Sequence, residues 1–267
     1  MNIEIYLEEK RKIVDEYLDK YLPKEKEYPT ILHEAMRYSV FSGGKRFRPI
    51  LAIAVCEACG GTFEDVISTA CALEMIHAYS LIHDDLPAMD DDDFRRGKES
   101  NHKKYGEDVA ILAGDALLTK AFEVLDVNVV KDIAKAIGSF GVVGGQVVDM
   151  QLARGELEID LPLIEYIHTR KTGALIAVSC IAGAKLAKKD ENVIEIIKHY
   201  GEKLGFAFQI IDDVFDNENY AVLLGDKEAR VTADNIINEA KQGLESLDIE
   251  KKDILIALAD YVVKRKN

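Results

Sequence analysis

Tryptophan is absent from the 267 residues, and the chain has only five prolines and four cysteines. So few cysteines exclude a dense disulfide framework and are typical of a reducing compartment. Basic side chains are also scarce, because 34 Lys and Arg stand against 48 Asp and Glu and leave a formal charge of −14. Duplex DNA needs a basic face that displaces counterions from phosphates, so we expect no nucleic-acid partner. An anionic ligand would need a local basic cluster or a metal ion.

Long apolar runs are missing as well. The longest nearly apolar stretch extends from Ala174 to Ala184, which is about half the length that a bilayer-spanning helix needs. The N-terminal segment mixes acidic and basic residues from Glu4 onward and lacks the apolar core of a secretory signal. We therefore expect a cytoplasmic protein without membrane insertion.

Two of the cysteines, Cys56 and Cys59, have CxxC spacing. They stand in an apolar run, and no second pair of ligands follows at zinc spacing. We therefore interpret both as small core residues.

Apolar spacing predicts helices almost throughout the chain. Between Ile194 and Phe215, apolar residues recur at alternating steps of three and four, which is one stripe on a long helix. The predicted helices cover residues 3–20, 30–41, 49–60, 64–86, 107–125, 129–152, 162–186, 191–216, 220–245 and 250–265. No alternating strand pattern and no linker rich in Pro or Ser interrupts them. We predict an all-α protein with a single domain over residues 1–267, built as a large helical bundle around a central cavity.

Six aspartates fall within residues 84–93, directly after an apolar helix and directly before Arg95 and Arg96. A solvated charge run would not explain the apolar approach, which places the leading aspartates at the mouth of a core. Buried carboxylates need protonation, an arginine partner or a metal ion. Hard divalent ions with oxygen ligands match this group best.

A second acidic group ends the long helix near residue 216. Gln209, Asp212, Asp213 and Asp216 fall within one arc of about 100° on a helical wheel. Carboxylates at a helix C-terminus oppose the macrodipole and need an external cation. Two carboxylate groups on separate helices predict a shared Mg²⁺ site, completed by water and a phosphorylated substrate.

Basic residues occur in short clusters that suit such a substrate. Residues 43–49, GGKRFRP, place three cations in a glycine-opened turn, Arg95 and Arg96 follow the first aspartates, and Lys171 precedes Thr172 and Gly173. Arg offers a planar fork to phosphate oxygens and Lys a point charge. Each cluster alone fits a solvated turn equally well, whereas together with the aspartates they indicate a diphosphate site.

Six segments, in order, resemble the signature motifs of the trans-polyprenyl diphosphate synthase family. The resemblance covers residues 40–225 and is carried by GGKRFRP, SLIHDDLPAMDDDDFRRGKESNH, LAGDALL, GGQVVDM, KTGAL and FQIIDDVFD. It implies an all-α, homodimeric, Mg²⁺-dependent enzyme, with Mn²⁺ as an alternative ion. Such an enzyme joins isopentenyl diphosphate to an allylic diphosphate such as dimethylallyl or geranyl diphosphate.

The resemblance also implies roles for individual residues. The metal ligands would be Asp84, Asp90 and Asp212, with Asp85, Asp213 and Asp216 acting through water or other side chains. The isopentenyl diphosphate site would comprise Lys45, Arg48, His77 and Arg96. The allylic site would comprise Arg95, Lys171, Thr172 and Gln209. The catalytic group would be Asp84, Asp90, Lys171, Thr172, Gln209 and Asp212. His77 lies seven residues before Asp84 and hence on nearly the same helix face, whereas the sequence gives His83 and His102 no role.

The expected mechanism follows from charge. Cations draw negative charge onto the departing diphosphate and lower the barrier to ionising the allylic C–O bond. Apolar residues around 70–82 and 174–181 would keep water from the allyl cation. The isopentenyl double bond then attacks, and the released diphosphate accepts the proton.

Product length is less constrained than the reaction. Tyr79, five residues before the first aspartate, and the Pro87-Ala88 insertion resemble bacterial-type farnesyl diphosphate synthases. Tyr79 would then be a floor that stops the chain at C15. An ideal wheel places Tyr79 about 140° from Asp84, with Ser80 closer beneath it, so Tyr79 as an ordinary core residue stays open. We predict a farnesyl product, with geranylgeranyl diphosphate (C20) as the alternative.

Two other functions were weighed. A terpene cyclase also uses an aspartate-rich Mg²⁺ site, but it has no use for the second diphosphate pocket that Lys45, Arg48 and His77 would form. A catalytically silent subunit has no reason to keep the aspartate motifs intact.

One segment departs from the family pattern. Related enzymes carry a loop of some twenty residues after the second aspartate motif, whereas Asp216 here runs almost directly into Tyr220. Either a lid has been lost or a mobile segment is missing from the sequence, and we favour the second because phosphate-capping loops are flexible. The lysine that this loop contributes to the allylic site therefore has no assignment here.

Overall fold

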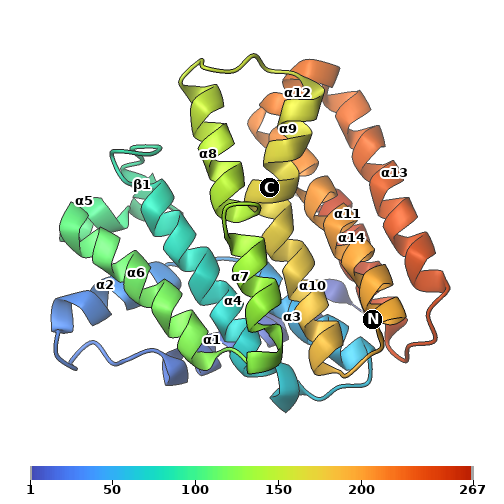
Figure 1. Ribbon diagram of the computed structural model, residues 1–267, viewed down its shortest axis with the longest axis horizontal. Helices are drawn as coiled ribbons and strands as arrows, with labels where there is room; N and C mark the ends of the chain where they lie inside the picture. The colour runs from blue at the N-terminus through green and yellow to red at the C-terminus, as the bar shows by residue number, and fades with distance from the viewer. Residues whose placement is uncertain (1, 266–267) are drawn as a thin grey trace. The chain divides into compact units, whose positions relative to one another are not determined.

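The computed structural model describes residues 2–265, and 76% of the chain is helical. The α-helices are α1 (Ile3–Tyr21), α2 (Thr30–Val40), α3 (Phe47–Ala58), α4 (Phe63–Asp84), α5 (Asn101–Tyr105), α6 (Glu107–Val124), α7 (Val130–Ile137), α8 (Val142–Ala153), α9 (Leu161–Ile167), α10 (Ala174–Leu186), α11 (Glu191–Asp216), α12 (Asn219–Leu224), α13 (Asp226–Glu245) and α14 (Lys252–Lys264) (Figure 1). The described residues contain one sheet, an antiparallel pair of two-residue strands, β1 (Phe94–Arg95) and β2 (Lys98–Glu99). The predicted all-α class is confirmed.

Glycines split two of the predicted helices. The segment predicted as one helix over 129–152 is α7 and α8, separated at Gly138–Gly141. A Cβ on Gly141 would lie 1.7 Å from the Ala136 carbonyl oxygen, so only glycine permits this turn. The segment predicted over 220–245 is α12 and α13, separated by Gly225 with a φ of +83°. Apolar periodicity continues across both breaks and therefore does not reveal them.

The helical path from Leu161 to Leu186 is continuous, as predicted, but its middle is wound differently. Residues His168–Gly173 form a π-helical turn, η2, between α9 and α10. Such turns are rare and are found mainly at functional sites. Lys171 and Thr172 lie in this turn.

The described chain divides into two compact units. The N-terminal unit comprises Glu4–Ile50 and Ile67–Val127, and the C-terminal unit comprises Leu51–Val66, residues 2–3 and the described chain from Asn128 onward. The division falls inside α3 and α4, so these helices contribute residues to both units. The single domain and central cavity predicted for residues 1–267 stay a prediction, and Met1 and residues 266–267 lie outside the described residues.

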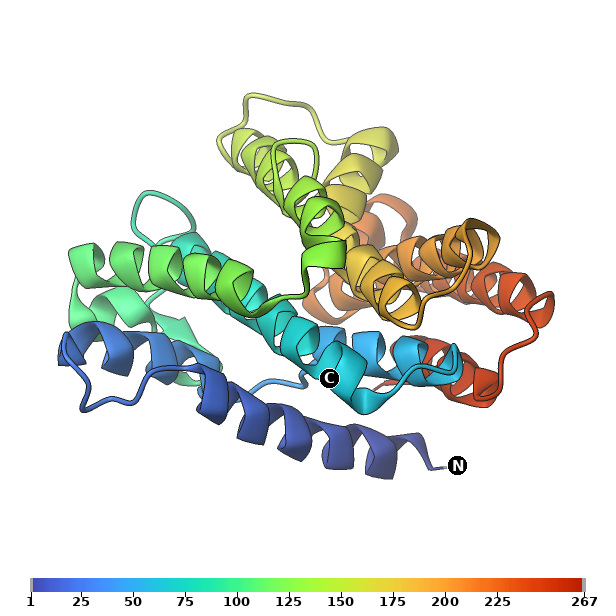
Figure 2. The same cartoon turned by 60° about the horizontal axis from the view of Figure 1, so that its bottom comes forward.

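Within the C-terminal unit, α11 packs against α10 and α13 (Figures 1 and 2). Gly201 and Gly205 allow the close approach of α10 and η2, because a Cβ on Gly201 would lie 2.9 Å from Ala177 Cα and one on Gly205 2.8 Å from Gly173 Cα. These contacts bring the helix of the second aspartate motif directly beside the turn that holds Lys171.

Within the N-terminal unit, α2 packs against α5 and α6. The Asn101 side-chain amide at the start of α5 donates to the Ala35 carbonyl at 2.9 Å and to Ser39 Oγ at 2.8 Å. The buried Asn101 thereby ties the segment after the aspartates to α2.

All four cysteines are buried and free of disulfides. Burial raises the pKa of Cys56 to about 12 and that of Cys59 to about 11. Thiols that resist ionisation are poor metal ligands and nucleophiles, so the prediction of core cysteines is confirmed.

Among the described residues, α4 is the one helix long and apolar enough to cross a membrane. Within its apolar window, 72% of the residues are buried inside the protein. A core helix of a soluble protein has the same length and composition.

The connection after the second aspartate motif is short in the structure too. Asn217 takes a left-handed conformation with φ 56° and ψ 50°, and α12 begins two residues later. The Glu218 N–H donates to the Asp213 carbonyl at 3.0 Å. The chain is continuous through this turn, so the interpretation of a missing mobile segment is replaced by a true two-residue connection.

The crossing of α10 over the part of α3 in the C-terminal unit provides a test of packing. A Cβ on Gly183 would lie 2.5 Å from the Ala52 carbonyl oxygen and 2.9 Å from Val55 Cβ. We expect Gly183→Ala to lower the free energy of unfolding by about 1–3 kcal/mol, because overpacked cores must shift their backbones. Urea denaturation measures this difference.

Gly243→Ala in α13 is the matched control. Its Cβ would meet only Ile196 Cγ2, at 3.9 Å, and the same substitution should be neutral or stabilising by up to about 1 kcal/mol through helix propensity. Equal effects at the two positions would contradict the close crossing of α3 and α10.

Candidate active site

The glycine-opened turn before α3 presents two of its three cations outward. Gly43 and Gly44 have φ values of 104° and 118°, which side chains other than hydrogen rarely adopt. Lys45 is exposed and Arg48 is partly exposed, whereas Arg46 is only 4% exposed. The sequence-based picture of three cations facing a ligand is therefore corrected to two, because Arg46 turns inward.

His77 lies on α4 in the midst of arginines. Burial, followed by the charges of Arg48, Arg96, Arg46 and Arg95, lowers the pKa of His77 well below its usual value. A cationic imidazole would add to an already positive group, so His77 is neutral at pH 7 and offers one donor and one acceptor nitrogen. Arg95, Arg96 and His77 also line one small cavity of about 20 Å³. The structure thus gathers four predicted diphosphate-binding residues around one point.

The first aspartate motif is a closed loop at the end of α4. Asp84 is the last residue of the helix, and the Asp90 N–H donates to the Asp84 carbonyl at 2.9 Å. Two further backbone bonds, from Met89 and Asp91 to the Leu86 carbonyl, hold the turn. Asp84 and Asp90 therefore emerge at the two ends of one tight loop, which suits carboxylates that share a metal ion.

Asp85 belongs to a separate arrangement. Its carboxylate is 3% exposed and accepts from Arg95 Nε at 2.9 Å, while Arg95 Nη2 also bonds Asp92 Oδ2 at 2.9 Å. Burial raises the pKa of Asp85, and the Arg95 guanidinium opposes this rise. Arg95, predicted for the allylic diphosphate, is thus held in place by two aspartates.

A second group of possible metal ligands lies beside this loop. One ligand atom each from Asp91, Asp93 and His102 lies within 4.8 Å of the others. The β1–β2 hairpin returns the chain so that buried His102 approaches the aspartates. Helical periodicity carries no signal for a two-residue hairpin, which is why the sequence gave His102 no role. Carboxylate oxygens at both groups fit a divalent ion; which group holds it is not fixed by this geometry.

Lys171 is oriented by the C-terminal unit. Its Nζ donates to Asp149 Oδ2 of α8 at 2.6 Å, and Asp149 stands in the motif GGQVVDM. A Cβ on Gly145 would lie 2.3 Å from the Lys171 backbone nitrogen, so the glycine of that motif makes room for η2. Thr172 follows in the same turn and is partly exposed.

The second aspartate motif has partners that the sequence did not reveal. Asp212, the predicted metal ligand, accepts from Arg265 Nη2 at 2.6 Å, and this guanidinium also donates to the Phe208 carbonyl at 2.9 Å. Arg265 is 8% exposed. It stands more than fifty residues from Asp212 in a helix end rich in Lys and Arg, where no local pattern marks it.

Asp213 is buried behind Asp212. Its Oδ2 lies 3.1 Å from His168 Nε2 and accepts from the Tyr220 N–H at 3.0 Å, and Gln209 Nε2 approaches its Oδ1 at 3.5 Å. Asp213 therefore joins η2, α11 and the start of α12. Gln209, predicted for the allylic site, is directed toward Asp213.

The two chain-length candidates lie on α4 beneath Asp84. Tyr79 is 7% exposed, and its ring packs edge-on against His83 at 5.8 Å between centroids. His83 Nε2 in turn lies 3.1 Å from the Ile111 carbonyl of α6. Ser80 Oγ donates to the His77 carbonyl at 3.0 Å. Tyr79 thus has an ordinary packing role within the N-terminal unit.

Each unit holds its own part of the predicted site. Asp84, Asp90 and the residues predicted for isopentenyl diphosphate belong to the N-terminal unit, whereas Lys171, Gln209 and Asp212 belong to the C-terminal unit. A metal ion shared between aspartates of the two units stays a prediction.

An all-α fold with two aspartate motifs and clustered cations defines a class of prenyl-transferring proteins, and comparison with known proteins agrees. The sequence profile of polyprenyl synthetases matches residues 29–230. The chain belongs to this family and is a prenyltransferase.

Individual relatives cover the chain almost completely. The chloroplastic geranylgeranyl pyrophosphate synthase of Capsicum annuum is 42% identical over 296 aligned positions, which cover 100% of this chain and 79% of the relative. The geranylgeranyl diphosphate synthase of Cyanophora paradoxa is 42% identical, with 100% and 97% covered. A crystal structure of an FPP/GFPP synthase from Zymomonas mobilis matches with a TM-score of 0.92 and 35% identity, covering 98% of this chain and 99% of that one.

The neutral state of His77 has a measurable consequence for stability. The unfolded chain takes up a proton below the ordinary histidine pKa of about 6.5, whereas the folded protein keeps His77 neutral to lower pH. The stability that this contributes is present above that pH and is lost as the pH falls. We expect the free energy of unfolding to fall less between pH 7.5 and pH 5.5 in His77→Gln than in the unmodified protein. Parallel curves in urea denaturation would show that His77 protonates equally in both states.

Proposed function

We propose that the protein condenses isopentenyl diphosphate with an allylic diphosphate in a Mg²⁺-dependent reaction, with Mn²⁺ as an alternative ion. The observation that carries the proposal is the closed Asp84–Asp90 loop beside the arginines that surround His77. Carboxylates of this kind suit a hard divalent ion, and the guanidinium groups suit diphosphate oxygens. A bound ion would supply positive charge to the departing diphosphate.

The chain's own residues are set before substrate arrives. Arg95 is held by Asp85 and Asp92, and Lys171 by Asp149, so neither cation has to be ordered during the reaction. Preorganised cations stabilise developing negative charge without reorganisation cost. Lys45, Arg48, Arg96 and His77 would receive the isopentenyl diphosphate, while Arg95, Lys171, Thr172 and Gln209 would receive the allylic one. Asp84, Asp90 and Asp212 would hold the ion.

For the product, we place geranylgeranyl diphosphate first. Two relatives at 42% identity are named as geranylgeranyl synthases, and the packing of Tyr79 against His83 gives that tyrosine a role other than a floor. Farnesyl diphosphate, expected from Tyr79 and the Pro87-Ala88 insertion, is the second candidate. The name of the Zymomonas relative, an FPP/GFPP synthase, favours keeping it.

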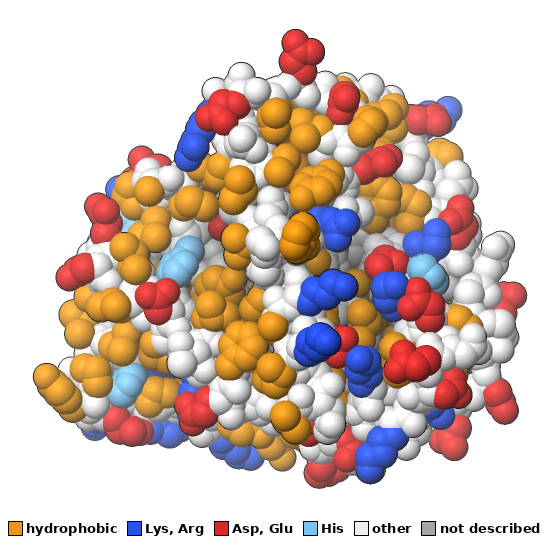
Figure 3. All heavy atoms as spheres, viewed as in Figure 1, with side chains coloured by type: hydrophobic (Ala, Val, Ile, Leu, Met, Phe, Trp, Pro, Cys, Tyr) orange, Lys and Arg blue, Asp and Glu red, His pale blue; other side chains and the backbone are white. Residues whose placement is uncertain are grey.

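We further propose a homodimer. Helix α6 exposes Ile111, Leu112 and Phe122 at 44%, 57% and 36%, and hydrophobic side chains gather over this helix in Figure 3. Exposed apolar patches of this kind mark interaction surfaces, and a second copy is the commonest partner. The cytoplasmic location stays a prediction, since one relative is named as chloroplastic.

The Asp84→Asn variant tests the aspartate loop. We expect turnover of isopentenyl and geranyl diphosphate to fall by at least about 100-fold, because an amide holds a divalent ion far less well than a carboxylate. The melting temperature should stay near that of the unmodified protein, as should the activity of Asp108→Asn, a control in α6. Full activity in Asp84→Asn with loss in Asp93→Asn would move the metal site to Asp91, Asp93 and His102.

Product analysis tests the chain length. With isopentenyl and dimethylallyl diphosphate and Mg²⁺, we expect a mainly C20 product, measured by chromatography after dephosphorylation. Tyr79→Met should leave this length unchanged, with Ser80→Ala as the control on the neighbouring position. A C15 product that lengthens only in Tyr79→Met would establish the floor and the farnesyl alternative. Absence of any condensation product would refute the proposed function itself.

A further inference from the structure

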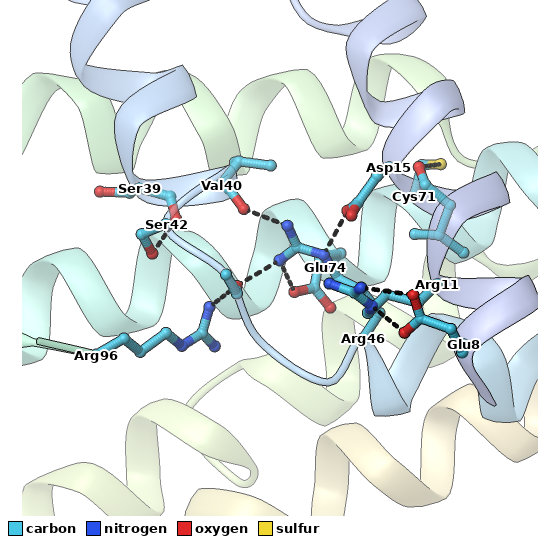
Figure 4. A network of polar contacts seen from close by, with 12 residues as sticks. Glu8, Arg11, Asp15, Ser39, Val40, Ser42, Arg46, Cys71, Glu74 and Arg96 are labelled. Carbon is cyan, nitrogen blue, oxygen red and sulfur yellow. Dashed lines mark hydrogen bonds and ion pairs between the residues drawn. The ribbon is translucent and has the colours of Figure 1, made fainter. Parts of the chain in front are cut away.

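Arg46 stands between the two outward cations Lys45 and Arg48, yet it turns away from them into the N-terminal unit. It is 4% exposed and adopts a left-handed backbone with φ +50°. Figure 4 shows its guanidinium at the centre of a polar network formed by α1, α2 and α4. A charged side chain between two binding residues, pointing the opposite way, calls for a reason of its own.

The guanidinium of Arg46 uses all of its nitrogens. Nε donates to Asp15 Oδ1 of α1 at 2.7 Å, and Nη1 donates to Glu74 Oε1 of α4 at 2.8 Å. Nη1 also reaches the Gly43 carbonyl at 3.1 Å, and Nη2 donates to the Val40 carbonyl at 2.5 Å. One planar group thus fixes two carbonyls of the turn and two carboxylates of neighbouring helices, which matches the rigid fork of Arg and no other side chain.

The partner Glu74 connects this network to the predicted isopentenyl diphosphate pocket. It is 3% exposed and lies three residues before His77, on the same side of α4. The bond from Arg46 to Glu74 therefore sets the turn that carries Lys45 and Arg48 at a fixed distance from the helix that carries His77.

A second connection runs through the Gly43 carbonyl. This oxygen accepts from Arg46 Nη1 and also from Arg96 Nη1 (Figure 4). Gly44 leaves the space, since a Cβ there would lie 2.5 Å from Arg96 Nη1. Arg96, the fourth residue predicted for isopentenyl diphosphate, thus depends on the same carbonyl that Arg46 holds.

Charge separates this role from substrate binding. Burial works to lower the pKa of Arg46, but Glu74 and Asp15 outweigh it and raise that pKa, so Arg46 stays charged and neutralised. A buried ion pair of this kind adds little stability over an apolar pair of similar volume. What an apolar pair does not supply is the set of donors to Gly43 and Val40.

We propose that Arg46 is a positioning residue for the isopentenyl diphosphate pocket. It does not touch substrate; it holds the backbone of the turn so that Lys45, Arg48, Arg96 and His77 converge on one diphosphate. The inference rests on the proposed function, because it concerns the same pocket.

The first test compares Arg46→Lys with the unmodified protein in steady-state condensation assays. Lysine keeps the charge but supplies one flexible nitrogen in place of the fork. We expect the KM for isopentenyl diphosphate to rise about tenfold or more, because small misplacements of binding groups are costly. The KM for geranyl diphosphate and kcat should stay within about twofold. Arg37→Lys is the matched control, since Arg37 in α2 bonds Asp19 and the Pro23 carbonyl away from the turn.

A second variant separates position from stability. Arg46→Met with Glu74→Met replaces both buried charges with apolar side chains of similar volume, which should recover most of the melting temperature lost in Arg46→Met alone. Asp15 tolerates the loss of its partner because a third of its side chain is exposed. The KM for isopentenyl diphosphate should stay raised in the double variant although its melting temperature recovers.

Two results would overturn the inference. One is an unchanged KM for isopentenyl diphosphate in folded Arg46→Lys, and the other is a KM that returns to normal together with the melting temperature in the double variant. Both presuppose an active unmodified protein. If that protein itself forms no condensation product, the proposed function fails, and this outcome is distinct from a failure of the role of Arg46.

Discussion

The cost of burying charge governs the described site. Three carboxylates are almost completely enclosed, and each lies against a cationic or ionisable side chain: Glu74 against Arg46, Asp85 against Arg95 and Asp213 against His168. Without these partners the enclosed charges would destabilise the fold. Because every pair joins different elements, pairing the charges also fixes the turn before α3, the hairpin after the aspartates and the π-turn before α10. The exposed Asp90 and Lys45 are thereby carried on segments that have only one arrangement.

Glycine solves the steric half of the same problem. The side chain of Arg96 passes over Gly44, the backbone of Lys171 passes over Gly145, and α11 approaches η2 at Gly205. At each place a methyl group would occupy space that a binding residue or its backbone needs. The glycines of the motifs are therefore required by close approach as much as by backbone flexibility.

Much of this arrangement was predictable from local patterns. The spacing of apolar residues predicted most helices and the all-α class, because a buried helix repeats its contacts every three to four residues. Asp84, Asp90 and the cation clusters stood out because so much charge beside an apolar helix demands compensation. What the sequence did not show depends on chain distance or on single residues: the break at Gly225, the inward turn of Arg46, the hairpin that returns His102, and the pairing of Arg265 with Asp212. No local period marks a contact between residues 212 and 265.

The two-residue connection after α11 has a consequence for how such proteins are varied. Alignment with the relatives runs over 296 and 297 positions against 267 residues, so they carry internal segments that this chain does without. Asn217 and Glu218 are exposed, and Asn217 has already left the helical conformation. Closing a longer loop across this point costs entropy that grows only logarithmically with its length. The turn is thus a natural graft point, at which a relative's longer segment would be accommodated by the existing scaffold.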